Sequence, residues 1–314
     1  MLINLLLLIV GFALLIKGAD FLIDGSVSLA KKFHISEIAI GLTVVAFGTS
    51  APELIVNIVS ALQNHPEICY GNVIGSNMFN TLVVLGVAGL FKPIFLQKST
   101  VRKEIPFVFF GTILIILLSN NFWLGGELLL SRYDGVVLIG CLVIFILYVL
   151  RIPRQQITAE YSDMAIFKTV LFLLVGMAGL FLGGELVVKN AVKIAEHYEV
   201  TKELISLTIV AFGTSLPELV TSLIALKKKS SDIAVGNVIG SNLFNIFMVL
   251  GVTSLIKPII FKPFLNIDLV ILALITLILF LLVFVGKVSK LNKFEAAVLL
   301  LCYSGYMYFL LQRG

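Results

Sequence analysis

Charged residues are scarce in this sequence. Only 13% of its 314 residues are Asp, Glu, Lys or Arg, whereas about a quarter of the residues in soluble domains are charged. Hydrophobic residues make up 59% of the chain, and the mean hydropathy is +1.09. This composition argues against a soluble enzyme, and the high apolar content excludes a disordered chain. The sequence therefore predicts a protein that resides in a lipid bilayer.

Residues that usually carry soft-metal or nucleophilic chemistry are also few. Three cysteines, Cys69, Cys141 and Cys302, are too scattered for a disulfide framework or a thiolate site. The three histidines are isolated, so we expect no zinc or haem site and no cofactor. There is no Gly-x-x-x-x-Gly-Lys-[Ser/Thr] sequence, which argues against an ATP-driven pump. We attribute the net charge of +5 to membrane topology and predict no nucleic-acid partner.

Long apolar runs recur along the whole chain. A bilayer-spanning helix needs about 20 mostly apolar residues, and continuous runs of this length are unlike the alternating strands of barrels. We predict an all-α polytopic membrane protein with ten transmembrane helices. The predicted spans are 2–23, 38–62, 71–92, 105–120, 134–151, 166–188, 204–226, 236–257, 267–286 and 294–311.

Basic residues give a predicted orientation. Most Lys and Arg residues follow odd-numbered spans, as Lys31, Lys32 and the run Lys227 to Lys229 do. Because cytoplasmic loops are enriched in Lys and Arg, this bias places both termini outside. We expect a multi-pass protein of the cell membrane that contacts the lipid bilayer and needs no obligate protein partner. Asp20 and its counterpart Glu185 lie near helix ends, where interfacial anchoring is the favoured interpretation.

The sequence contains an internal duplication. Residues 18–93 align without a gap with residues 183–258, at a constant offset of 165. The first repeat is assigned to residues 1–150, a short cytoplasmic connection to 151–164 and the second repeat to 165–314. Because each half has five predicted spans, an odd number, the second half should be inverted relative to the first. Inverted repeats are typical of secondary transporters, which bind substrate near the membrane midplane.

Two glutamates lie at equivalent positions within apolar spans. Glu53 and Glu218 each follow a Gly-Thr-Ser-x-Pro sequence. A charge at the bilayer centre costs at least ~2.5–3.5 kcal/mol, so such a residue is usually functional. Proline removes a backbone donor, so we expect a kinked helix that frees the carbonyl oxygen of Gly48, or of Gly213 in the second repeat, with those of Ala46 and Ala211 nearby.

A second polar stripe follows in each repeat. Serine and asparagine residues four positions apart share one helical face, so we favour them as ligands. They are Ser76 and Asn80 in the first repeat and Ser241 and Asn245 in the second. For the neighbouring asparagines two roles remain open, namely ion binding and interhelical hydrogen bonding. These are Asn72, Asn77, Asn237 and Asn242.

Every polar group gathered by these motifs is an oxygen donor. Carboxylate, hydroxyl, amide and main-chain oxygens suit hard cations such as Ca²⁺ and Na⁺. Two carboxylates balance one divalent ion or two monovalent ions. The charge balance therefore predicts that a divalent ion and monovalent ions compete for the same ligands.

The paired Gly-Thr-Ser-x-Pro-Glu and Gly-Asn-x-x-Gly-Ser-Asn motifs resemble the two alpha-repeats of the cation/Ca²⁺ exchanger superfamily, on the Na⁺/Ca²⁺ exchanger side. The short central connection is similar to that of compact prokaryotic forms. The resemblance implies twelve ion ligands, namely Ala46, Thr49, Ser50, Glu53, Ser76, Asn80, Ala211, Thr214, Ser215, Glu218, Ser241 and Asn245. Relatives carry Asp at the position of Asn245, which leaves ion selectivity and stoichiometry open.

The expected function is antiport of Na⁺ and Ca²⁺ by alternating access. Spans 2–23 and 166–188 carry no ligand motif and are glycine-rich, so we expect them to slide across the motif helices. A Ca²⁺/H⁺ exchanger or a K⁺-dependent Na⁺/Ca²⁺ exchanger is the alternative, and a cation channel is a more remote one. We expect no enzymatic activity, because neither motif span offers a His or Lys base beside Ser50 or Ser215.

Overall fold

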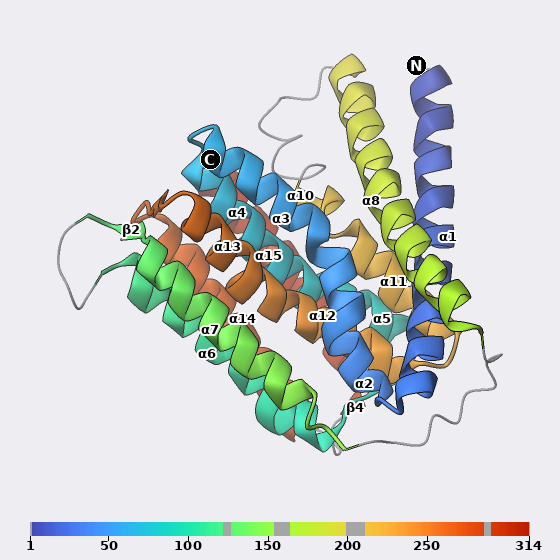
Figure 1. Ribbon diagram of the computed structural model, residues 1–314. Coiled ribbons are helices and arrows are strands. Elements are labelled where there is room, and N and C mark those ends of the chain that lie inside the picture. Colours follow the sequence, from blue (N-terminus) through green and yellow to red (C-terminus); the bar gives the residue numbers. More distant parts are fainter. Residues whose placement is uncertain (1, 122–126, 154–163, 199–210, 286–289, 314) are drawn as a thin grey trace. The chain divides into compact units, whose positions relative to one another are not determined.

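The computed structural model describes residues 2–121, 127–153, 164–198, 211–285 and 290–313 (Figure 1). Among these residues, eight helical stretches are long and apolar enough to cross a membrane, which confirms an all-α polytopic membrane protein. They are Leu2–Phe33, Glu37–Leu62, Pro66–Phe91, Arg132–Val149, Ile166–His197, Ser231–Ile256, Leu265–Phe284 and Lys293–Arg313.

The count of ten spans stays a prediction. The predicted fourth span corresponds to α6 (Ile105–Ser119), which has only 15 residues and follows the π-helical segment η3 (Thr100–Glu104). The predicted seventh span begins at residues 204–210, which lie outside the described residues. Its described part consists of α10 (Ala211–Gly213) and α11 (Leu216–Lys227).

The long stretches are built from the following elements. The first five are α1 (Leu2–Phe33), α2 (Glu37–Ile40), η1 (Gly41–Val45), α3 (Ala46–Leu62) and α4 (Pro66–Phe79). Next come η2 (Asn80–Val84), α5 (Leu85–Phe91), α7 (Arg132–Val149), α8 (Ile166–His197) and α12 (Ser231–Leu243). The last are η5 (Phe244–Val249), α13 (Leu250–Ile256), α14 (Leu265–Val285) and α15 (Lys293–Arg313).

Within the described residues, four two-residue strands accompany the helices. β1 (Ile94–Phe95) pairs antiparallel with β4 (Lys290–Leu291), and β2 (Leu129–Leu130) pairs antiparallel with β3 (Ile259–Ile260). They satisfy backbone groups between helices, where no helical hydrogen bond is available. The sequence did not predict them, because two residues are too few to show an alternating pattern.

Contacts divide the chain into two compact units that differ from the predicted repeats. Unit 1 comprises Met1–Pro52 and Arg151–Asn237, and unit 2 comprises Glu53–Leu150 and Val238–Gly314. Each unit therefore combines segments of both predicted repeats. The boundaries fall inside α3 and α12, the helices that carry the sequence motifs.

In unit 1 the two longest helices, α1 and α8, pack against each other along their glycines (Figure 1). A Cβ atom added to Gly18 would lie 2.7 Å from the main-chain nitrogen of Leu180, and one added to Gly183 would lie 2.7 Å from that of Leu15. These glycines thus allow close contact between α1 and α8. The expected movement of the two helices across the motif helices stays a prediction. Gly184 is different, because it faces Pro217 of α11.

In unit 2, α13 packs against α7, α15 against α5, and α14 against α6. An ion pair between the buried Asp268 and the exposed Arg313 links the start of α14 to the end of α15. The guanidinium of Arg313 donates to both carboxylate oxygens of Asp268, at 3.2 and 2.8 Å, and the Tyr306 hydroxyl donates to the same carboxylate at 3.2 Å. These bonds compensate for the desolvation of Asp268.

The turns that follow α3 and α11, the motif helices that carry Glu53 and Glu218, have the same geometry in both repeats. Asn64 and Lys229, which are 165 positions apart, both adopt a left-handed conformation, with φ of 64° and 66°. In each turn the main-chain N–H of the next residue donates to a carbonyl of the helix. His65 donates to Ser60, and Ser230 donates to Ala225, both at 2.9 Å. These are helix-terminating turns of the Schellman type.

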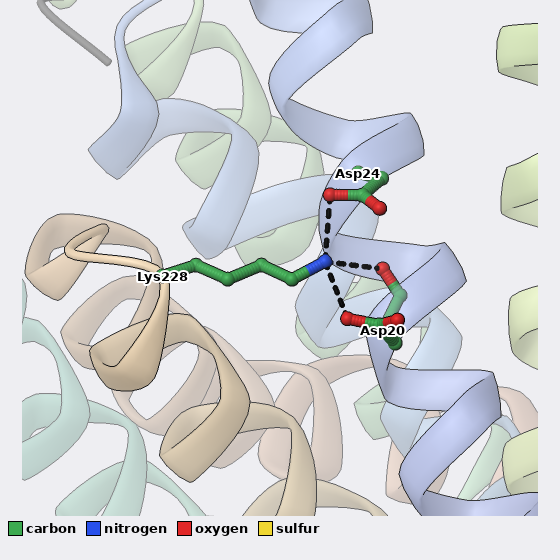
Figure 2. A network of polar contacts seen from close by, with 3 residues as sticks. All are labelled: Asp20, Asp24 and Lys228. Atoms are coloured by element: carbon green, nitrogen blue, oxygen red, sulfur yellow. Dashed lines mark hydrogen bonds and ion pairs between the residues drawn. The ribbon is translucent and has the colours of Figure 1, made fainter. Parts of the chain in front are cut away.

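Lys228, next to this turn in the second repeat, links α11 to α1. Figure 2 shows its ammonium group between Asp20 and Asp24, at 2.5 Å from one carboxylate and 2.6 Å from the other. It also donates to the main-chain oxygen of Asp20 at 3.1 Å. Asp20 is therefore an ion-pair partner within the protein, and Lys228 has a structural contact besides any influence on topology.

We predict that Lys228→Met lowers the stability of the protein. The substitution leaves two neighbouring carboxylates without their shared cation, at a cost of about 1–3 kcal/mol for partly buried groups. Thermal melting in detergent measures the change. Lys227→Met is the matched control, because Lys227 is exposed on the same turn. Equal melting temperatures for the two variants would show that the Lys228 contacts do not stabilise the fold.

Candidate cation-binding site

The first motif helix places hydroxyl and carbonyl oxygens together. η1 leads directly into α3, whose first residue is Ala46. The Thr49 hydroxyl, in unit 1, lies 3.3 Å from the carbonyl oxygen of Ala46 and 3.0 Å from Oδ1 of Asn237. Both are acceptors, so this hydroxyl can donate to either of them. Ala46 and Thr49, two of the predicted ligands, are therefore in contact.

The carboxylate of Glu53 meets a second predicted ligand in unit 2. The Ser76 hydroxyl of α4 donates to Oε1 of Glu53 at 3.5 Å, and both side chains are buried. The amide of Asn72 fixes the backbone at the same point, since its Nδ2 lies 3.4 Å from the carbonyl of Glu53 and 2.7 Å from Oδ1 of Asn57. The carboxylate is thus held on a helix that is itself tied to α4.

The second repeat has the same arrangement in unit 1. Nδ2 of Asn237 donates to the carbonyl of Glu218 at 3.2 Å and to the hydroxyl of Ser222 at 3.0 Å. Asn237 is the counterpart of Asn72, and Ser222 is that of Asn57, at the offset of 165. The first asparagine of each Gly-Asn motif therefore bonds the main chain of the glutamate, which assigns an interhelical role to Asn72 and Asn237.

Asn57 and Ser222 were missed in the sequence analysis. Both are buried, and each follows its glutamate by four residues on the same helical face. Polar residues at this spacing in apolar spans, at equivalent positions of both repeats, are the signal that could have identified them.

The proline occupies a different position in each of the two motif helices. Pro52 lies inside α3, which continues from Ala46 to Leu62. In the second repeat the helix is interrupted between α10 and α11, and Pro217 lies in the first turn of α11. We expected a kinked helix with exposed carbonyls in both repeats. The first repeat instead has a proline inside a continuous helix, and the second has a break in the helix. Proline is well tolerated in a first turn, where its missing N–H has no helical partner.

A π-helical segment follows each partner helix at the predicted ligand asparagine. α4 passes into η2 at Asn80, and α12 passes into η5, which contains Asn245. π-helical turns are rare and occur frequently at functional sites. Four fully buried predicted ligands have side-chain oxygens without a hydrogen-bond partner among the described residues, namely Ser50, Asn80, Ser215 and Asn245. Buried polar atoms normally have partners, so these oxygens are available to a bound cation.

The predicted ligands are distributed over both units. Unit 1 holds Ala46, Thr49, Ser50, Ala211, Thr214, Ser215 and Glu218, and unit 2 holds Glu53, Ser76, Asn80, Ser241 and Asn245. Ala211 begins α10, and its side chain lies outside the described part of the structure. Within the units, the contacts Ala46–Thr49 and Glu53–Ser76 join predicted ligands directly.

Buried carboxylates among neutral oxygens, on interrupted or π-bulged helices that recur in a duplicated sequence, define a membrane transporter for cations. Comparison with known protein families supports this class of protein. The sequence model of the family described as sodium/calcium exchanger protein matches residues 3–151 and 168–312. The chain belongs to this family.

Relatives and solved structures span nearly the whole chain. CaxA of Alkalimonas amylolytica, a candidate antiporter, is 37% identical over 99% of both chains. The sodium/calcium exchanger MaX1 of Methanosarcina acetivorans is 28% identical over 97% of both chains. The structure of the sodium-calcium exchanger NCX_Mj soaked without Na⁺ and Ca²⁺ is similar, with a TM-score of 0.83 and 31% identity over 98% of this chain and 99% of that chain.

We predict that Pro52→Ala impairs transport more than Pro217→Ala does. In α3 an alanine restores the helical hydrogen bond to the carbonyl of Gly48, whereas the break before α11 persists without its proline. Initial rates of ion flux in proteoliposomes should fall several-fold for Pro52→Ala, with unchanged or raised melting temperature. A lower melting temperature for Pro52→Ala, or equal rates of ion flux for the two variants, would contradict different roles for the two prolines.

Proposed function

We propose that this protein is a secondary active antiporter that exchanges Na⁺ for Ca²⁺ across the membrane by alternating access. The observation that carries the proposal is the pair of buried glutamates, Glu53 and Glu218, each set among neutral oxygens in a duplicated motif. Membership of the sodium/calcium exchanger family and the similarity to MaX1 and NCX_Mj support the same pair of ions.

We propose as ion ligands the twelve residues distributed over the two units. Carboxylate, hydroxyl, amide and main-chain oxygens suit both Ca²⁺, which takes six to eight oxygen ligands, and Na⁺. Two carboxylates neutralise one Ca²⁺ or two Na⁺, so occupancy by one ion reduces the attraction for the other. Competition of this kind couples the two fluxes. On this account the protein needs no cofactor and catalyses no chemical reaction.

The membrane arrangement is proposed as follows. Residues 1–150 and 165–314 form two inverted repeats joined by a cytoplasmic connection over 151–164. Both termini face outward in the cell membrane. The distribution of Lys and Arg and the odd number of predicted spans in each half support this topology.

We also propose that α1 and α8 move together during alternating access. They contribute none of the proposed ligands, and their close glycine-mediated packing favours movement as one pair rather than independent sliding.

Na⁺-driven Ca²⁺ uptake into proteoliposomes tests the proposed function. Vesicles loaded with Na⁺ and diluted into Na⁺-free buffer should accumulate ⁴⁵Ca²⁺. Glu53→Gln and Glu218→Gln should each abolish uptake, because each removes one of the two charges and an oxygen ligand. Glu185→Gln is the matched control: it makes the same change at an exposed carboxylate on α8 and should retain uptake.

Uptake measured in the same vesicles distinguishes Na⁺/Ca²⁺ exchange from the alternative functions. Uptake that requires a pH gradient instead of a Na⁺ gradient would identify a Ca²⁺/H⁺ exchanger. A requirement for K⁺ on the Na⁺ side would identify a K⁺-dependent exchanger. Ca²⁺ flux without any counter-ion would indicate a channel. Undiminished uptake in both glutamate variants would contradict the ligand assignment.

A further inference from the structure

A chain of hydrogen bonds joins three buried asparagines in unit 2. Nδ2 of Asn77 donates to the main-chain oxygen of Asn242 at 3.3 Å. Oδ1 of Asn77 in turn accepts from Nδ2 of Asn245 at 3.2 Å. All three side chains are at most 1% exposed. Asn245 is a proposed ion ligand, whereas Asn77 and Asn242 are not.

The polarity of this chain is fixed at one end. A main-chain carbonyl only accepts hydrogen bonds, so Asn77 must turn its NH₂ group toward Asn242 and its oxygen toward Asn245. Asn245 must therefore turn its own NH₂ group toward Asn77. Its Oδ1, which has no hydrogen-bond partner among the described residues, then points away from Asn77.

The equivalent asparagine of the first repeat has no such constraint. Asn80 is the counterpart of Asn245, and neither of its amide atoms has a hydrogen-bond partner within the described residues. Asn242, the counterpart of Asn77, donates instead to the hydroxyl of Thr81 at 2.9 Å. The second repeat has Ile246 where the first has Thr81, so the sequence itself breaks the symmetry.

We propose that Asn77 is a positioning residue for cation binding, which holds the Asn245 amide with its carbonyl oxygen directed at the ion. This inference rests on the proposed function and adds an orienting residue to it. An ionised carboxylate at position 245 would place acceptor against acceptor at Asn77. Asn77 therefore favours a neutral ligand at position 245.

The effect of removing Asn77 follows from the loss of this orientation. Without the hydrogen bond to Asn77, the Asn245 amide can turn its NH₂ group toward the cation. The NH₂ group carries partial positive charge, so it repels the cation instead of coordinating it. Loss of one orienting neutral hydrogen bond corresponds to about a threefold to tenfold weaker Ca²⁺ affinity. The maximal exchange rate should change little, because the bond acts on ion binding.

The experiment compares Asn77→Leu with Asn242→Leu in Na⁺-driven ⁴⁵Ca²⁺ uptake. Leucine has the branched shape of asparagine and the same number of side-chain heavy atoms, although its methyl groups make it somewhat larger. Asn242→Leu keeps the main-chain oxygen that accepts from Asn77. Asn77→Leu should raise the half-saturating Ca²⁺ concentration about threefold to tenfold, and Asn242→Leu should raise it by less than about twofold. Asn77→Ala should raise the half-saturating Ca²⁺ concentration as much as Asn77→Leu does, because both remove the hydrogen bond that orients Asn245. If the leucine variant fails to fold, Asn77→Ala serves in its place.

A double-mutant cycle distinguishes positioning from a structural role. If Asn77 acts through Asn245, Asn77→Leu should not weaken Ca²⁺ affinity further in an Asn245→Ala background. Additive losses, or wild-type affinity in Asn77→Leu, would overturn the inference while wild-type exchange remained intact. Absence of Na⁺-driven uptake in the wild type would instead overturn the proposed function.

Discussion

The burial of two carboxylates in an apolar helical protein is the constraint on which the rest of the structure depends. An ionised glutamate at the bilayer centre costs at least ~2.5–3.5 kcal/mol. Glu53 and Glu218 are both fully buried, so oxygen donors and cations must offset that cost. On the proposed function, the two charges make cation binding favourable, and the neutral oxygens around each of them select the cations that fit.

Amide side chains hold this arrangement in place. Asn72 and Asn237 bond the main chain at Glu53 and Glu218, and so connect each motif helix to its partner helix. Asn77 extends the same principle to Asn245, a proposed ligand, because a main-chain carbonyl sets the direction of the whole amide chain. Buried hydrogen-bond networks of this kind specify one geometry, since any reversed amide leaves groups unpaired.

The sequence was sufficient for features that depend on composition and repetition. The helical membrane class followed from long apolar runs. Equivalent positions in the two repeats singled out the two glutamates and the serine and asparagine stripes, whereas the full set of twelve candidate ligands came from the resemblance to the exchanger family. Features that depend on contacts between distant segments could not be predicted. The glycines of α1 and α8 predicted a smooth surface but not that Gly18 and Gly183 face the opposite helix. The role proposed for Asn77 could not be predicted either, because it depends on a hydrogen bond to the main-chain carbonyl of Asn242, a group that every residue has.

Competition between ions at the carboxylates is the central claim, and equilibrium binding tests it most directly. Binding of ⁴⁵Ca²⁺ to the purified protein in detergent would be measured while the Na⁺ concentration is raised. We predict that Na⁺ displaces Ca²⁺ with a Hill coefficient above one, because one Ca²⁺ balances the same charge as two Na⁺. Ca²⁺ binding that does not respond to Na⁺, or that persists in the protein with both Glu53→Gln and Glu218→Gln, would contradict the account.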